Sequence, residues 1–149
     1  MGMSDPLRCV AFAIFLIFAA TPAATGEPSI SAPNALQKAR AGDLRIIDVR
    51  SPREWRQTGI PAGAASITMH EAEGLGIFLR KVLSAVSGDR DAPVALICAR
   101  GNRSHAMQQF LKRNGFTRVL DISEGMLGRN ALSPGWLARE LPVENCAQC

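Results

Sequence analysis

The residues from Cys98 to Ser104 read Cys-Ala-Arg-Gly-Asn-Arg-Ser and combine a nucleophile with a loop suited to anions. The thiolate is the reactive form of cysteine, and a helix N-terminus or nearby cations favour it. Gly101 lets the loop curl so that its main-chain N–H groups point inward, and the helix that follows would present its positive end to the same place. We therefore expect a thiolate that attacks or carries an anionic group.

Cys98 is predicted to be the catalytic nucleophile, and the loop residues after Ala99 are predicted to bind its substrate. These residues are Arg100, Gly101, Asn102, Arg103 and Ser104. Arg100 would attract an anionic donor at the rim, whereas Arg103 would brace the loop more than touch the substrate. In the alternative reading Cys98 is a small buried hydrophobic residue and Arg100 is a solvated charge. The spacing of glycine, arginine and serine after the cysteine favours the nucleophile.

The run PVALIC from Pro93 to Cys98 leads into the loop with no polar alternation, which is typical of a strand buried on both faces. Further strands are expected over residues 45–49, 65–69 and 118–122, and helices over residues 31–41, 52–57, 76–87 and 104–114. This alternation predicts an α/β domain with a mainly parallel central sheet flanked by helices on both sides. Ligand sites in such sheets form beyond the carboxyl ends of the strands, which is where Cys98 stands.

The composition limits the other kinds of function. The 149 residues, of which 47% are hydrophobic and 20% charged, suffice for one ordinary globular domain. The net charge of +4 is modest and the basic residues are scattered, so we expect no nucleic-acid partner. His70 and His105 are well separated and are predicted to be surface residues. With so few ligands available, neither a metal nor another cofactor is expected.

Residues 1–25 have the layout of a secretory signal peptide. Arg8 precedes an apolar run from Cys9 to Ala20, and small residues follow it, so cleavage is expected between Ala23 and Gly26. The run is shorter than the ~18 to 20 apolar residues of a membrane span, which favours cleavage over a permanent anchor. The mature protein would then be periplasmic or secreted, without stable membrane insertion, and its domain would span residues 26–144.

Two motifs resemble those of single-domain rhodanese-like sulfurtransferases. The loop Cys-x-x-Gly-x-Arg-Ser after PVALI looks like their active-site loop, and Ile47 to Trp55 (IDVRSPREW) is similar to their upstream signature. Weaker matches over Gly59 to Ala64 and Trp136 to Glu144 extend the resemblance to nearly all of residues 30–144.

The chain departs from this family pattern in three places. Ile60 directly follows Gly59, where the family often has a histidine between them, and Ala62 is extra. Glu124-Gly125 replaces the usual Gly-Gly, and residues 128–135 look like an insertion.

The upstream motif is predicted to be structural. We expect Asp48, Arg50 and Glu54 to form a network of charges and hydrogen bonds that anchors the strand end. Trp55 and Trp136 are expected to be packing residues.

The resemblance implies a rhodanese-like domain in which Cys98 takes the outer sulfur of thiosulfate or a similar donor and releases sulfite. The sulfur would be held as a persulfide, stabilised by loop amides, until a thiol or cyanide accepts it. The implied partners are a small anionic sulfur donor and a thiol acceptor, for example a thioredoxin-like protein.

Two other functions stay open. One is a non-catalytic persulfide carrier or binding module in an exported sulfur pathway, which would use the same Cys98. The other is a cysteine phosphatase or arsenate reductase of related fold. A phosphatase loop needs Cys-x5-Arg so that the arginine can clamp the phosphoryl group, whereas Arg103 comes one residue early here.

The tail over residues 145–149 ends in Cys146-Ala147-Gln148-Cys149, which the resemblance does not cover. It is expected to be irregular. A Cys-x-x-Cys pair can close a disulfide in an oxidising compartment. The pair would be either a passive disulfide or a relay, in which one cysteine attacks the Cys98 persulfide or exchanges with a thioredoxin-like partner.

Overall fold

The structure is a computed structural model that describes residues 1–2 and 28–149. The predicted signal peptide lies outside the described residues except for its first two. In the described part of the chain, no helix is long and apolar enough to span a bilayer.

A parallel four-stranded sheet forms the centre of the domain, in the strand order β3-β1-β4-β5. The strands are β1 (Arg45–Asp48), β3 (Ala65–Ser66), β4 (Val94–Ile97) and β5 (Val119–Asp121). Asp48 at the end of β1 pairs with Ser66 of β3 on one side and with Ile97 of β4 on the other. The carboxyl ends of these three strands therefore meet at one edge of the sheet, directly before Cys98.

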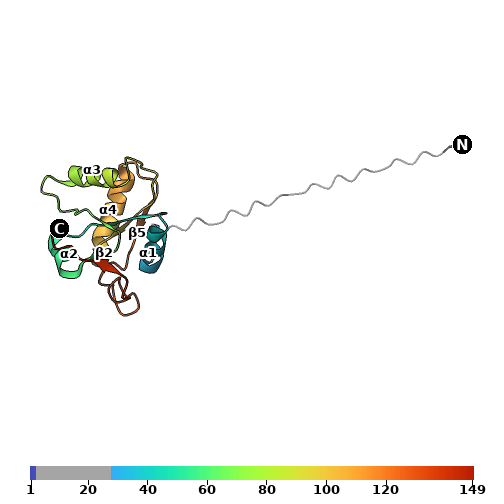
Figure 1. The fold of residues 1–149 in the computed structure, drawn as a ribbon. Helices are drawn as coiled ribbons and strands as arrows, with labels where there is room; N and C mark the ends of the chain where they lie inside the picture. Colours follow the sequence, from blue (N-terminus) through green and yellow to red (C-terminus); the bar gives the residue numbers. More distant parts are fainter. Residues whose placement is uncertain (3–27) are drawn as a thin grey trace.

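Helices cover both faces of this sheet, as predicted (Figure 1). Helix α3 (Leu75–Ala85) and helix α4 (Asn102–Arg113) pack on the face that carries Ile47 and Leu96. Helix α1 (Ala32–Arg40) packs on the opposite face, which carries Ile46 and Ile97. Neighbouring residues of a strand point to opposite faces, so the adjacent apolar residues of β1 and of β4 supply both cores at once.

A second, two-stranded sheet was not predicted from the sequence. Strand β2 (Ile60–Pro61) pairs antiparallel with β6 (Val143–Glu144), which brings the C-terminal part of the chain to the end of α2 (Pro52–Thr58). Gly59 has φ +74°, and a Cβ there would lie 2.8 Å from the Glu144 oxygen. Strands of this length have no hydrophobic period to recognise, which is why the sequence did not reveal them.

Candidate active site

Cys98 immediately follows β4 and is only 1% exposed. Its Sγ accepts a hydrogen bond from the main-chain N–H of Gly101 at 3.1 Å. The Ser104 hydroxyl lies 3.4 Å from the same sulfur and 3.1 Å from the Gly101 oxygen. The loop therefore curls around its own sulfur and turns donors toward it, which is the arrangement a sulfur-borne negative charge needs.

Helix α4 begins at Asn102, two residues earlier than predicted. This is a correction to the predicted start at Ser104. Asn102 and Arg103 stand in the first turn of α4, and the N-terminus of the helix lies next to the sulfur. The sequence misplaced the boundary because Gly101, which has φ +91°, serves as the N-cap, and glycine is a weak signal for that position.

Gly101 is required for a second reason. A Cβ at this position would lie 2.2 Å from the main-chain oxygen of Ser123, so the loop passes in direct contact with the segment after β5. Gly125 meets the loop in the same way, because a Cβ there would lie 2.6 Å from the Ala99 oxygen. Hydrogen bonds from Met126 N to Cys98 O and from Leu127 N to Ala99 O, both of 2.9 Å, fix the loop against this segment.

Glu124 occupies the place of the first glycine in the usual Gly-Gly pair and has a structural task. Its side chain is buried, and its Oε1 accepts a hydrogen bond of 2.7 Å from the main-chain N–H of Ala32, the first residue of α1. The carboxylate thus satisfies a free donor of the helix N-terminus and complements the helix dipole. This departure from the family pattern fastens α1 to the segment that supports the active-site loop.

Arg103 turns to Glu54 of α2 instead of the sulfur. Its Nη1 and Nη2 donate to the two carboxylate oxygens of Glu54 at 2.8 and 2.5 Å. Glu54 also accepts hydrogen bonds from the N–H and hydroxyl of Ser51 in a capping box. The hydrogen bond from Arg103 lowers the pKa of Glu54 to about 2. Partial burial of Glu54 opposes this shift, and the hydrogen bonds from Ser51 add to it. The hydrogen bond to Glu54 also raises the pKa of Arg103.

Arg100 is exposed at the rim, and its Nη1 donates to the Gly128 oxygen at 2.9 Å. Asn102 is also exposed. His70 is exposed, as predicted, and its Nε2 lies 3.5 Å from Arg103 Nη1. The loop therefore brings the predicted residues together around Cys98, with Arg103 paired to a carboxylate and Arg100 at the edge.

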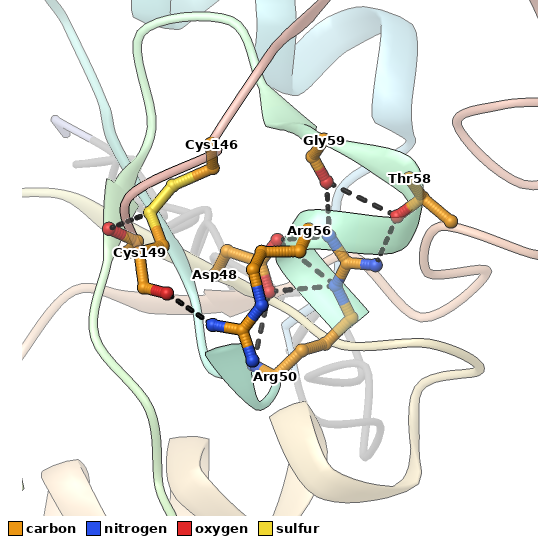
Figure 2. The surroundings of a disulfide bond; sticks show 8 residues. Asp48, Arg50, Arg56, Thr58, Gly59, Cys146 and Cys149 are labelled. Atoms are coloured by element: carbon orange, nitrogen blue, oxygen red, sulfur yellow. Dashed lines mark hydrogen bonds and ion pairs between the residues drawn. A yellow bond between two sulfur atoms is a disulfide. The ribbon is translucent and has the colours of Figure 1, made fainter. Parts of the chain in front are cut away.

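The upstream motif forms two networks where the sequence predicted one. The buried Asp48 and Arg50 pair with each other through Oδ2 and Nη2 at 2.7 Å, and Arg50 continues to Thr58 and Gly59 at the end of α2 (Figure 2). Glu54 belongs to the separate Ser51 and Arg103 network described above. Trp55 and Trp136 are both buried, with exposures of 4% and 0%, which confirms their packing role.

The C-terminal cysteines form a disulfide between Cys146 and Cys149, with their Cα atoms 5.3 Å apart. The tail lies against α2 and β3, because Arg56 Nη1 donates to the Cys149 main-chain oxygen at 2.5 Å and Cys149 Sγ lies 3.7 Å from the Ser66 hydroxyl (Figure 2). Strand β1 separates β3 from β4. Ser66, which the disulfide contacts, therefore lies two inter-strand spacings, about 10 Å, from β4, the strand that leads to Cys98.

A family model described as "Rhodanese-like domain" matches residues 31–131, which is more than half of the chain. The chain belongs to the rhodanese-like family. A thiosulfate sulfurtransferase, GlpE, of Glaesserella parasuis is 30% identical to this rhodanese-like chain over 102 residues, which are 68% of this chain and 79% of the relative. A sulfurtransferase of Allochromatium vinosum is 29% identical over 101 residues, covering 68% and 78% of the two chains.

A solved structure from Thermoplasma volcanium, a rhodanese-related protein, is similar in fold. It shares 28% identity and a TM-score of 0.56, and the alignment covers 79% of this chain and 98% of that chain. The rhodanese-like α/β fold expected from the sequence is thus confirmed by both the sequence family and the arrangement of the strands.

The sequence did not reveal the roles of three residues near the site, Glu124, Gly125 and Asp121. Gly125 and Glu124 acquire their roles only because the chain after β5 returns to the loop. Asp121 at the end of β5 is a buried carboxylate, 5% exposed, within a run that reads as an ordinary strand. Only the change from Gly-Gly to Glu124-Gly125 stood out, and it indicated a difference without indicating its purpose.

Proposed function

We propose that this protein transfers sulfane sulfur from a small anionic donor such as thiosulfate to a thiol or cyanide acceptor through a persulfide on Cys98. The observation that carries the proposal is the Cys98 sulfur held by the Gly101 N–H at the start of α4. The names of the two bacterial relatives support the same chemistry. The burial of Cys98 favours a small donor over a bulky one.

In the first step the Cys98 thiolate attacks the outer sulfur of thiosulfate. A new S–S bond forms on Cys98, the S–S bond of thiosulfate breaks, and its electron pair leaves with sulfite. The persulfide carries the negative charge on its outer sulfur, which loop N–H groups would stabilise as preorganised donors. In the second step an acceptor thiolate or cyanide attacks that outer sulfur and restores the Cys98 thiolate.

The contacts of Arg103 argue against the phosphatase alternative. Phosphoryl transfer of that kind needs a guanidinium free to clamp two phosphate oxygens. The guanidinium of Arg103 already makes this bidentate contact with Glu54, and it comes one residue too early in the loop. Sulfur transfer needs no such clamp, so the observed pairing favours it.

The experiment compares the mature chain with Cys98→Ser using thiosulfate and cyanide. We expect the variant to lose turnover and remain folded, because a hydroxyl does not ionise near neutral pH. Mass spectrometry after thiosulfate should find an added mass of ~32 Da on Cys98, one sulfur atom. The matched control is Cys146→Ser, which should keep both properties.

Other results of this experiment would support the alternative functions. Persulfide on Cys98 without turnover to cyanide or any thiol would identify a carrier. Turnover of an aryl phosphate or arsenate in place of sulfur donors would identify the phosphatase or reductase reading. An added sulfur atom found on Cys149 and not on Cys98 would contradict the assignment of Cys98 as the residue that carries the persulfide.

We also propose that the protein acts after export, in the periplasm or outside the cell. The proposal rests on the apolar run and small residues of positions 9–25. Mass spectrometry of protein from the cell envelope fraction should find a mature N-terminus between residues 24 and 26. An intact Met1 in a cytoplasmic fraction would contradict it.

A further inference from the structure

Asp121, the last residue of β5, is a buried carboxylate that the sulfur chemistry described above does not use. The residue is 5% exposed, and its Oδ1 has no hydrogen-bond partner in the described part of the chain. Burying a carboxylate in this way is costly, because the ionised form loses its water. Such a group needs a physical explanation, and its position relative to Cys98 supplies one.

The packing of α4 on β5 places Asp121 opposite Ser104 (Figure 1). Residues of a strand alternate between its faces, so Asp121 points to the same side as Val119, which lies in the core beneath α4. Helix α4 connects the parallel strands β4 and β5 and therefore runs antiparallel to both. The Gln108 Nε2 donates to the Val119 oxygen at 2.9 Å and fixes the register between helix and strand.

From that contact, equal steps along the two elements lead to the serine and the aspartate. One helical turn back from Gln108 is Ser104, a distance of about 6 Å along the axis. Two strand residues beyond Val119 is Asp121, a distance of about 6.6 Å. The two side chains therefore lie at the same level, and a hydrogen bond joins the Ser104 hydroxyl to the Asp121 side chain.

The same hydroxyl contacts the reactive sulfur. The Ser104 oxygen lies 3.4 Å from Cys98 Sγ and 3.1 Å from the Gly101 oxygen, and Ser104 is 0% exposed. A hydroxyl has one hydrogen and two lone pairs. The sulfur, the Gly101 oxygen and the Asp121 carboxyl therefore share a single hydrogen that solvent does not reach.

The protonation of Asp121 determines where this hydrogen points. An ionised carboxylate can only accept, so it competes with the Cys98 sulfur for the Ser104 hydrogen. A protonated carboxyl can instead donate to the Ser104 oxygen, which leaves the Ser104 hydrogen for the sulfur. A negative charge on the sulfur gains a donor in the second state that it lacks in the first.

The surroundings of Asp121 favour the protonated form. Burial raises the pKa of Asp121, because the charged form has lost its water. The hydrogen bond from Ser104 and the positive charges of His105 and Arg129 oppose this shift, while the negative charge of Glu124 adds to it. Asp121 therefore keeps its proton to a higher pH than an exposed aspartate does.

We propose that Asp121 is a positioning residue that acts on the Cys98 sulfur through the hydroxyl of Ser104. When Asp121 holds a proton, Ser104 donates to the sulfur, and when Asp121 is ionised, Ser104 turns to the carboxylate. Its part in sulfur transfer rests on the proposed function, in which the sulfur is negative both as a thiolate and as a persulfide. Its effect on the thiolate does not depend on any sulfur donor.

The test measures the pH at which half of Cys98 is a thiolate, from the ultraviolet absorbance of the thiolate in the mature protein. Cys98 is the only free cysteine in the described part of the chain, so it alone gives this signal. Asp121→Asn imitates the protonated carboxyl, because the amide is uncharged and can donate to Ser104. We expect this midpoint to fall by at least ~0.5 pH unit, the scale of one hydrogen bond, whereas Ser104→Ala should raise it by a similar amount.

The double variant separates action through Ser104 from a charge effect through space. In the Ser104→Ala background, Asp121→Asn should shift the midpoint by less than half as much as in the parent. Asp89→Asn removes an exposed aspartate and is the control that should leave the midpoint unchanged.

Turnover gives a separate measurement. With thiosulfate and cyanide, the acid limb of the pH profile of kcat/KM should move with the midpoint in Asp121→Asn. If no variant and no parent protein transfers sulfur, the proposed function fails, while the absorbance midpoint still decides the role of Asp121.

Carbon NMR of the unaltered protein replaces the variants if they do not fold. The Cβ signal of Cys98 should then show a step at the pH where the side-chain carboxyl carbon of Asp121 titrates. Three results would overturn the proposal. They are an unchanged midpoint in either single variant, an equal shift by Asp121→Asn with and without Ser104, and a Cys98 signal that does not respond to the titration of Asp121.

Discussion

The ion pair between Glu54 and Arg103 joins α2 to the first turn of α4, and Glu54→Gln removes its negative charge while keeping the shape of the side chain. The pKa of Glu54 falls from 4.5 to about 2 in the folded protein, which corresponds to at most about 3.4 kcal/mol at 1.36 kcal/mol per unit. The two side chains are 27% and 28% exposed, so solvent screens the pair. We expect the variant to lose about 1 to 2 kcal/mol of the free energy of unfolding at neutral pH.

The pH dependence of this loss identifies the charge as its cause. The folded state favours the ionised carboxylate, so the stabilisation is fully present above the unfolded pKa near 4.5 and is lost as the pH falls toward 2. The difference between parent and Glu54→Gln should therefore be greatest near neutral pH. It should shrink steadily below about pH 4.5 and approach zero near pH 2.

Urea denaturation at several pH values measures this difference. Glu71→Gln is the matched control, because Glu71 pairs with Lys81, whose side chain is 53% exposed, and it should cost less than ~0.5 kcal/mol at any pH. A difference for Glu54→Gln that stays the same from neutral pH to pH 2 would refute the reasoning and show that packing, not charge, is lost.

Three further predictions concern the loop and the tail. Arg100→Ala should raise the KM for thiosulfate with little change in kcat, and added salt should reduce the difference from the parent. Gly101→Ala should cost at least ~2 kcal/mol more than Gly42→Ala, by urea denaturation, because both have positive φ but only the former meets main-chain atoms. Truncation after Glu144 should leave turnover with cyanide unchanged. If the tail is a relay, the truncated protein should be slower than the full chain with a thioredoxin-like acceptor, whereas equal rates with that acceptor would identify a passive disulfide.

The sequence predicted the central sheet because its strands are buried on both faces. The apolar run that contains β4 has no polar alternation, and with the alternation of strands and helices along the chain it indicates a parallel sheet between helices. It also placed Cys98 at the carboxyl edge, since the loop directly follows such a strand. Local patterns determine these features, so a single sequence is enough to read them.

The rest of the site depends on contacts between distant parts of the chain. The support of the loop by Gly125 and the cap of α1 by Glu124 appear only when β5 lies beside β4. The β2–β6 pair joins residues more than eighty positions apart and has no hydrophobic period of its own. Such long-range contacts leave no local trace, which is why the sequence indicated an unusual Glu124 without explaining it.

The pairing of Arg103 decides how the loop is expected to hold an anion. Its charge is largely balanced by Glu54, and Arg100 stands at the rim with one guanidinium nitrogen bound to Gly128. The groups turned toward the sulfur are the Gly101 N–H and the Ser104 hydroxyl, at the N-terminus of α4. Fixed dipoles of this kind stabilise a negative charge on the sulfur, such as that on the outer sulfur of a persulfide. In the proposed reaction, sulfite carries two charges and meets only the Arg100 guanidinium at the rim, because Arg103 is paired with Glu54, so it should leave readily once the S–S bond has broken.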